Sequence, residues 1–304
     1  MDVYLPIANL AVGGHWIVLL GICTGILSGV FGVGGGFLTT PFLIFYGIPP
    51  TVAAASAATQ VTGASVSGVL AHSRNKGVDY KIGGVIVVGG LVGALLGALL
   101  FEALRAIGQI DVVINVLYVI LLGTIGGLML REGLQALRPA KDGGKKRAAK
   151  RRHHPMIAAL PYRWRFYSSG LYISPLAPLI LGLIVGVLTM LMGVGGGFIL
   201  VPAMLYVLGM SARVVVGTSL FNILFITMLV TMVHVFTTRA VDIVLAGLLL
   251  IGSVTGAQIG TRLAQLAKPE VLRLTLAAIV LAIALRMAYG LTITPDEVYT
   301  VVPL

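Results

Sequence analysis

The fold is decided by a glycine-rich motif that occurs twice in the chain. Residues 31–41 read FGVGGGFLTTP, and residues 192–202 read MGVGGGFILVP. Further matches follow each copy in the same order and at nearly the same spacing. They pair Ser56 with Thr218, Gln60 with Asn222, His72 with His234, Asp79 with Asp242, Gly93 with Gly256 and Gly97 with Gly260. A single glycine run can recur by chance, whereas this ordered series indicates a tandem duplication.

The composition around the two motifs is that of a membrane protein. Hydrophobic residues make up 58% of the 304 residues, charged residues make up 10%, and the mean hydropathy is +1.04. Soluble domains are about 45–50% apolar and about one quarter charged. The surplus apolar surface must face lipid, which predicts an all-α, polytopic integral membrane protein. Each half contains five apolar stretches, at 12–31, 37–48, 52–72, 82–101 and 112–130, and at 174–192, 198–209, 212–236, 241–262 and 270–290.

The second stretch of each half, at 37–48 and 198–209, is too short for the ~20 residues of an ordinary membrane span. Three successive glycines precede it, and each glycine costs about 1 kcal/mol relative to alanine inside a helix. The sequence therefore predicts a broken or re-entrant helix in each repeat. The first stretch has no basic region before it and no cleavage site after it, so we expect it to stay in the mature protein.

Positive charge is concentrated between the halves. We divide the chain into a first transmembrane repeat (1–130), a basic linker (131–173) and a second transmembrane repeat (174–304). The net charge is +11, and residues 131–165 hold eleven of the 21 lysines and arginines. The positive-inside rule places such a linker in the cytoplasm. Contact with anionic lipid explains the charge better than nucleic-acid binding, which we do not expect.

The charges of the short loops indicate how the two repeats are oriented. Loop 73–81 is basic, loop 102–111 is acidic, and the linker is basic again. Loop 262–269 is basic and the C-terminal tail is acidic. This alternation favours an odd number of crossings in each half, as inverted repeats require, with both chain ends outside. Parallel repeats stay open as the alternative.

The glycine runs are the first candidate for a substrate site. A broken helix at membrane depth is tolerated only where it is buried in protein or lines a watery cavity. A helix that restarts after the break directs N–H groups and the positive end of its dipole at that cavity, which suits an anion. The alternative is that the glycines only allow close packing. The candidate substrate-binding residues are Gly32, Gly34, Gly35, Gly36, Phe37, Gly193, Gly195, Gly196, Gly197 and Phe198.

Polar residues on the segment that follows each break complete the candidate site. Their hydroxyls and amides can bind an oxyanion without a fixed charge, although hydrogen bonding between helices is the alternative. These substrate-binding candidates are Ser56, Thr59, Gln60, Thr218, Ser219 and Asn222. His72 and His234 are candidates for proton coupling, with an interfacial position as the alternative.

Several other residues have a simpler structural interpretation. Asp79 and Asp242 precede helical stretches and are predicted N-caps. The glycines at 89, 93, 97, 252, 256 and 260 are spaced as small-residue packing ridges. The single cysteine, Cys23, is predicted to lie in the core, although a reactive thiol is the alternative. We expect no cofactor and no metal site.

The duplicated GVGGGF followed by proline, together with the GAxxG runs at Gly93 and Gly256, resembles the sulfite exporter TauE/SafE family, also called the toluene-sulfonate uptake permeases. The resemblance covers about 12–130 and 174–290 and leaves the basic linker unmatched. It implies a secondary transporter of small sulfur-containing anions, such as sulfite or sulfonates including sulfoacetate, across the bacterial cytoplasmic membrane. The family often has a sequence like Gly217–Leu220, whereas residues 55–58 diverge to ASAA.

Three other functions are weaker. An anion channel could use the same broken helices as a continuous pore. An intramembrane hydrolase would need a Ser–His pair, and Ser65 lies outside a GxSxG context. A primary pump is disfavoured because the chain has no GxxxxGK[ST] phosphate loop. The expected partners are a small anionic substrate and membrane lipid, while homodimer formation stays open.

Overall fold

The computed structural model describes residues 2–31, 34–74, 77–137, 164–166, 169–266 and 269–292. Every predicted apolar stretch is helical. The first half contains α1 (Gly14–Phe31), α2 (Gly36–Phe45), α3 (Pro50–Arg74), α4 (Tyr80–Ala106) and α5 (Ile110–Leu137). The second contains α7 (Leu176–Met192), α8 (Gly197–Pro202), the π-helix η1 (Ala203–Val207), α9 (Ala212–Val233), the π-helix η2 (His234–Thr238), α10 (Ile243–Leu266) and α11 (Pro269–Thr292).

Membrane-spanning helices account for most of this architecture. Six helices among the described residues are long and apolar enough to cross a membrane, and they include α1, α4, α5, α9, α10 and α11. The segments α2, α7 and Gly197–Val207 are shorter apolar helices. These lengths confirm the all-α, polytopic membrane class. Most of the basic linker, residues 138–163, lies outside the described residues.

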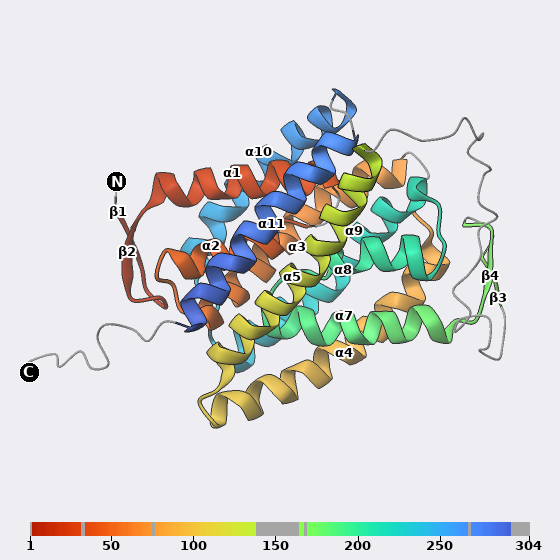
Figure 1. Ribbon diagram of the computed structural model, residues 1–304. Helices are drawn as coiled ribbons and strands as arrows, with labels where there is room; N and C mark the ends of the chain where they lie inside the picture. The colour runs from red at the N-terminus through yellow and green to blue at the C-terminus, as the bar shows by residue number, and fades with distance from the viewer. Residues whose placement is uncertain are drawn as a thin grey trace, which may run out of the picture. The chain divides into compact units, whose positions relative to one another are not determined.

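Two short antiparallel hairpins were not predicted. Strands β1 (Asp2–Leu5) and β2 (Leu10–Gly13) precede α1, and β3 (Trp164–Phe166) and β4 (Leu171–Ile173) precede α7. Strands of three or four residues are too short for alternating hydrophobicity to distinguish them from a loop. In Figure 1, the β1–β2 hairpin lies at the left end of α1 and the β3–β4 hairpin at the right end of α7. The equivalent helices α1 and α7 therefore begin at opposite ends of the part of the chain that contains both.

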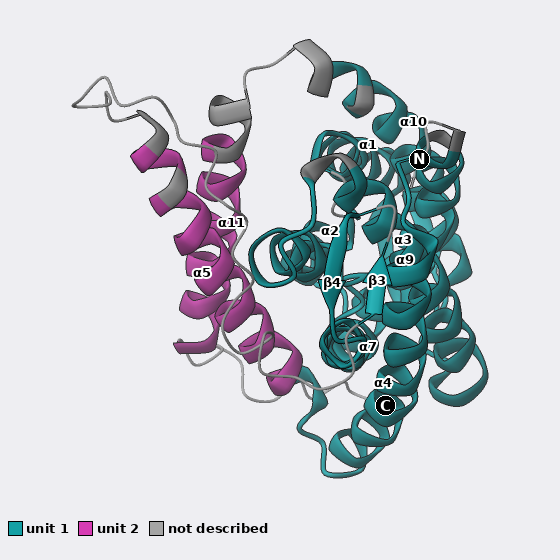
Figure 2. Ribbon diagram, turned by 90° about the vertical axis from the view of Figure 1, so that its right-hand side faces the viewer, with its two compact units in different colours: residues 1–111, 140–267 teal, residues 112–139, 268–304 magenta. Residues whose placement is uncertain are grey.

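Helices from the two halves combine into two compact units (Figure 2). Unit 1 comprises residues 1–111 and 140–267, and unit 2 comprises residues 112–139 and 268–304. Unit 2 contains most of α5 together with α11, the last helix of each repeat. Gly126 lies against α11 within this unit, because a Cβ there would be 2.9 Å from Val280 Cγ1.

Within unit 1, each repeat packs its helices against those of the other. Helix α1 lies along α10, α4 lies along α7, and α3 lies against α9. The predicted glycine ridges make the first two pairings possible. A Cβ on Gly93 would overlap the Leu183 carbonyl oxygen, and one on Gly256 would overlap the Ile22 carbonyl oxygen. The ridges are therefore close-packing surfaces, as predicted.

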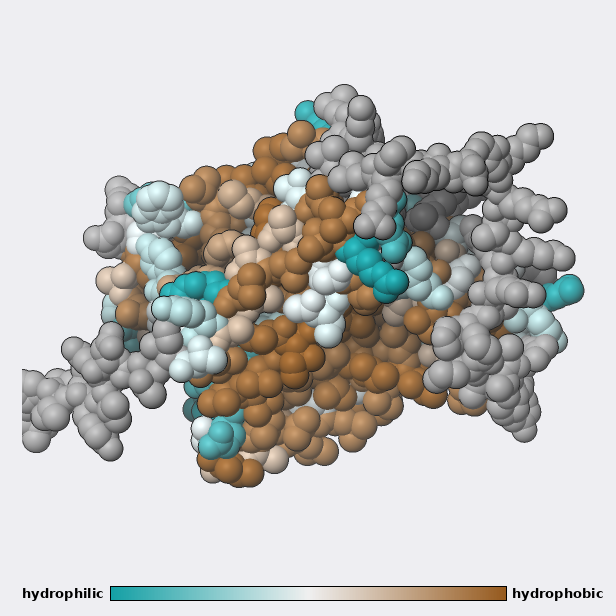
Figure 3. Space-filling model, in the orientation of Figure 1, coloured by the Kyte–Doolittle hydropathy of each residue, from teal (hydrophilic) through white to brown (hydrophobic). Residues whose placement is uncertain are grey.

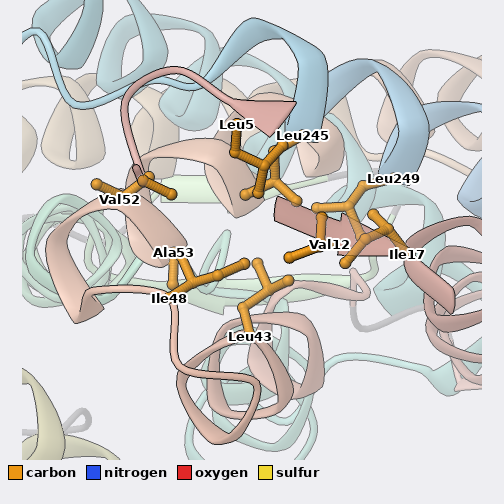
Figure 4. Packing of buried hydrophobic residues seen from close by; sticks show 10 residues of the cluster. Leu5, Val12, Ile17, Leu43, Ile48, Val52, Ala53, Leu245 and Leu249 are labelled. Atoms are coloured by element: carbon orange, nitrogen blue, oxygen red, sulfur yellow. The ribbon is translucent and has the colours of Figure 1, made fainter. Parts of the chain in front are cut away.

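A core cluster in unit 1 joins the N-terminal hairpin to four helices, α1, α2, α3 and α10 (Figure 4). Leu5 of β1 and Val12 of β2 are buried with Leu43 at the end of α2 and with Leu245 and Leu249 of α10. The hairpin thus closes one end of the helix packing.

The described surface is strongly apolar. Large hydrophobic side chains are exposed along the spanning helices, including Leu99 (72% exposed) and Ile251 (62% exposed). Hydrophobic residues cover most of the face seen in Figure 3. Such a surface is stable against lipid and not against water. Cys23 lies on this exterior, which corrects the prediction that it belongs to the core. An apolar environment selects a thiol equally well inside the protein or against lipid, so composition alone could not separate the two.

Candidate functional site

The first glycine break separates α1 from α2. Helix α1 ends at Phe31, and α2 begins at Gly36 with Gly35 as its N-cap. Gly34 has a φ of +77°, which L-residues rarely adopt, and the Gly35 carbonyl accepts hydrogen bonds from the N–H groups of Leu38 and Thr39 at 3.1 Å. The candidate residue Gly32 lies outside the described residues. The predicted interruption is present.

The second break separates α7 from α8 and is more distorted. Helix α7 ends at Met192, and three of the next four residues have left-handed backbones. Their φ values are +70° at Gly193, +75° at Gly195 and +74° at Gly196. Only glycine adopts this conformation without strain, which explains the residue type at these three positions.

The two breaks meet in the interior of unit 1. A Cβ on Gly36 would lie 2.7 Å from the Gly193 carbonyl oxygen and 3.1 Å from that of Val194. The rings of Phe37 and Phe198 stack at 4.5 Å with an interplanar angle of 7°. Residues that are equivalent in the duplication therefore become neighbours. Close packing of glycine and convergence of two helix ends occur here together.

The central helices α3 and α9 bring polar side chains to the breaks. Gln60 and Asn222 are both buried. The Gln60 amide nitrogen donates to Thr24 Oγ1 at 3.4 Å, and the Asn222 amide nitrogen donates to the Thr218 carbonyl at 2.7 Å. Each amide oxygen lacks a hydrogen-bond partner within the described chain, as does the buried Ser219 hydroxyl. Unsatisfied buried polar atoms of this kind mark places where a water, ion or ligand belongs.

Ser56 and Thr218 have structural partners. The backbone N–H of Asp79 donates to Thr218 Oγ1 at 2.9 Å, and that of Asp242 donates to Ser56 Oγ at 3.2 Å. Each hydroxyl thereby ties one repeat to the other. The Thr59 hydroxyl donates to the Ala55 carbonyl of its own helix at 3.1 Å.

Asp79 and Asp242 are N-caps, as predicted. The Asp79 carboxylate accepts from the N–H groups of Lys81 and Ile82, and that of Asp242 accepts from Val244 and Leu245. Their second oxygens accept hydrogen bonds from the hairpin that precedes the opposite repeat's first helix. Ser169 donates to Asp79, and the Ile7 N–H donates to Asp242 at 3.0 Å. The two aspartates therefore join the hairpins to the helices.

We predict that Asp79→Ala and Asp242→Ala each destabilise the protein by about 2 kcal/mol, because a buried cap and a hydrogen bond to a hairpin are lost together. Asp79→Asn and Asp242→Asn keep a cap acceptor and are expected to lose about half as much. Unfolding of the purified variants in detergent measures both. Equal losses for the Asn and Ala variants would contradict the capping role.

The two histidines have different surroundings. His234 is buried at the start of η2, where Nδ1 lies 3.1 Å from Thr238 Oγ1 and Nε2 lies 3.2 Å from the Met190 carbonyl. Met190 lies just before the second glycine break, so His234 is connected to that break through α7. His72 is half-buried at the end of α3, with its Cβ facing Gly217.

Three residues beside the breaks were missed by sequence reasoning. Thr24 borders Gly35, while Val61 and Ile223 border Gly34. Val61 and Ile223 directly follow Gln60 and Asn222, so the duplication could have located them. Thr24 has no equivalent signal, because Val185 occupies the matching position. Across the described ranges, no group of three or more His, Cys, Asp and Glu residues is placed to hold a metal ion.

The chain is similar to known membrane proteins. The model of the family described as "Sulfite exporter TauE/SafE" matches residues 17–287. "Probable membrane transporter protein YjnA" of Bacillus subtilis is 27% identical over 279 residues, which cover 89% of this chain and 98% of the relative. "Probable membrane transporter protein" of Xylella fastidiosa is 25% identical over 292 residues, which cover 94% and 95%. No solved structure is significantly similar to the chain.

Proposed function

Because the chain belongs to the sulfite exporter TauE/SafE family, and is therefore a multi-pass membrane transporter, we propose that it carries small sulfur-containing anions across the cytoplasmic membrane. The substrates we propose are sulfite and sulfonates, and the mechanism is secondary transport without ATP hydrolysis. The substrate site is the region where the two glycine breaks converge.

Convergence of the breaks is the observation that carries this proposal. The first N–H groups of a helix have no partner within that helix, and the dipole makes this end positive. Two helix segments begin beside each other at Gly36 and Gly197, with Phe37 and Phe198 in contact. Discontinuous helices of this kind form midplane binding sites in secondary transporters. The surrounding side chains are uncharged, so the site attracts an anion without trapping it in an ion pair.

Flux through the purified protein in liposomes tests the proposal. We expect saturable uptake of sulfite that depends on an imposed ion gradient and is competed by sulfonates. Chloride and sulfate serve as control anions, and empty liposomes as the control for leakage. Flux that rises linearly with sulfite concentration would favour the channel. Equal flux of all anions would contradict the proposed substrate class.

The hydrolase alternative has less support from the site. The Ser65 hydroxyl is buried without a hydrogen-bond partner in the described part of the chain, and His72 lies two helical turns further along α3. A serine nucleophile needs a base within hydrogen-bond reach. His72 and His234 stay our candidates for proton coupling, and a proton gradient is one arm of the flux assay.

We further propose that the repeats are inverted, with the linker in the cytoplasm. The opposite positions of the two hairpins in Figure 1 and the alternation of loop charges support this topology. In a Cys23→Ser background, a membrane-impermeant thiol reagent should label cysteines introduced at positions 2 and 297 in intact cells. A cysteine at position 147 should react only after permeabilisation. Labelling of position 147 from outside would reverse the orientation, and labelling of only one terminus would indicate parallel repeats.

A further inference from the structure

The central helix pair α3–α9 contains buried oxygen atoms that have no hydrogen-bond partner among the described residues. They include Gln60 Oε1 and Asn222 Oδ1, which are equivalent in the duplication, and Ser219 Oγ. Their three side chains are at most 1% exposed. Each such atom has lost its hydrogen bonds to water and has gained none in the protein, which destabilises the folded state. Such a pair of equivalent residues marks a place where a water, an ion or a ligand belongs, and in a transporter the substrate is one such partner.

The neighbours of Asn222 determine which end of its amide is free. Its nitrogen lies 2.7 Å from the Thr218 carbonyl oxygen. A carbonyl can only accept, so the NH₂ group must face it. The free end of Asn222 is consequently Oδ1, an acceptor.

The same argument applies to Gln60 through one more hydrogen bond. The Thr24 hydroxyl donates its proton to the Gly21 carbonyl at 3.2 Å. It must then accept from the Gln60 amide nitrogen, which lies 3.4 Å away. Thr24 therefore orients the Gln60 amide as well, and its free end is Oε1. Both equivalent amides present acceptors.

Residues next to both acceptors border the glycine breaks. Thr24, the partner of Gln60, borders Gly35, whose Cβ would lie 3.1 Å from the Thr24 carbonyl oxygen. Ile223, next to Asn222, borders both Gly34 and Gly195. In the proposed site, the first N–H groups of α2 and the Ser219 hydroxyl are the donors for an oxyanion. The two amide oxygens are acceptors, so they need a hydrogen-bond donor on the ligand.

We infer that the transported anion must itself carry a hydrogen-bond donor. This inference rests on the proposed function and specifies its substrate class: hydrogen sulfite in its O–H form, or a sulfonate that bears a hydroxyl or ammonium group. A fully deprotonated sulfite, or a sulfonate without a donor, would place its own oxygens against two acceptor oxygens. That arrangement leaves the amides unsatisfied and adds electrostatic repulsion.

A matched pair of ligands tests this requirement. Ethanesulfonate and 2-hydroxyethanesulfonate carry the same charge and differ by one hydroxyl group. Calorimetry on the purified protein is expected to show that the hydroxylated anion binds at least about tenfold more tightly, as one buried hydrogen bond predicts. 2-Aminoethanesulfonate, with an ammonium donor, should share this preference.

Substitution of the acceptors should remove the preference. Gln60→Leu and Asn222→Leu are each expected to reduce the affinity ratio of the two sulfonates to about threefold or less, mainly by weakening binding of the hydroxylated one. Thr62→Val is the matched control, because it removes a hydrogen bond between α3 and α9, from Thr62 to Thr227 at 2.8 Å, and should keep the ratio. The ratio of the two affinities does not depend on the fraction of protein that is active. Gln60→Leu also leaves the hydrogen bond from Thr24 to the Gly21 carbonyl in place.

The outcomes separate the inference from the function on which it rests. Equal affinity for the two sulfonates in the wild-type protein would overturn the donor requirement and leave the transporter of sulfur anions intact. Equal affinity that depends on sodium would also overturn it, because the amide oxygens would then hold a cation. Failure of sulfite and of every sulfonate to bind would overturn the proposed function itself.

Discussion

Replacing Gly193 with alanine is expected to leave little or no folded protein. Gly193 has a φ of +70°, and its Cβ would overlap the backbone carbonyl of Ala54 in α3. A left-handed backbone costs about 1–2 kcal/mol for a residue with a side chain. Overpacking costs about 1–3 kcal/mol more, and here the Cβ meets backbone atoms of Ala54, which cannot move to another rotamer. Fluorescence-detected size-exclusion chromatography of the expressed variant measures the yield of folded protein.

Gly34→Ala is the matched control for this result. Gly34 has nearly the same φ, +77°, but a Cβ there makes only ordinary contacts of 3.5 Å with Ile223 and Val61. This variant should be destabilised by backbone strain alone and should still fold, with a melting temperature a few degrees below that of the wild type. If both variants melt alike, the contact between the second break and α3 does not limit stability.

Gly35→Val is expected to abolish substrate binding in a protein that still folds. The φ of Gly35 is −66°, which any residue adopts, so the substitution adds no backbone strain. The new side chain would press on Thr24, whose carbonyl oxygen lies 3.1 Å from the position of the Cβ. Thr24 orients Gln60, so the change disturbs the break and the amide together. We expect affinity for sulfite to fall by at least about a hundredfold, equivalent to about 2.8 kcal/mol.

Gly247→Val controls for the loss of a glycine in a membrane helix, because a Cβ there meets nothing within 4 Å. It should bind sulfite as the wild type does.

Gly196→Val is a poorer probe, since its φ of +74° and an overlap with Val185 predict a folding defect. Gln60→Ala and Asn222→Ala should weaken binding by about 1–2 kcal/mol each. Wild-type affinity in Gly35→Val would leave close packing as the role of that glycine.

The helices and their interruptions could be predicted because each depends on local sequence. Apolar runs define the helices, and three successive glycines end one wherever they occur. The caps Asp79 and Asp242 follow from the same local logic, because a short acceptor before an apolar run satisfies the first N–H groups of the helix.

The pairing of partners could not be predicted, because it depends on residues distant in sequence. Ser56 was a candidate ligand residue, and nothing in its own segment shows that its hydroxyl meets the backbone of Asp242. Thr24 belongs to an evenly apolar helix, and only the three-dimensional contact with Gln60 identifies its role. The hairpins are short elements stabilised by what they cap, so their own sequence carries little signal.

The pairing of α1 with α10 governs how the protein is made. Helix α1 is synthesised long before α10, so the glycine-lined face that receives α10 has no partner helix until the second repeat has been made. In the same way, α4 has no partner until the linker and α7 have been synthesised. Neither repeat can therefore mature alone, and assembly depends on contacts of very high sequence separation, which form slowly. Two half-length chains divided within the linker still contain every surface that the assembly needs, so they should reconstitute the transporter only when they are produced together in one membrane.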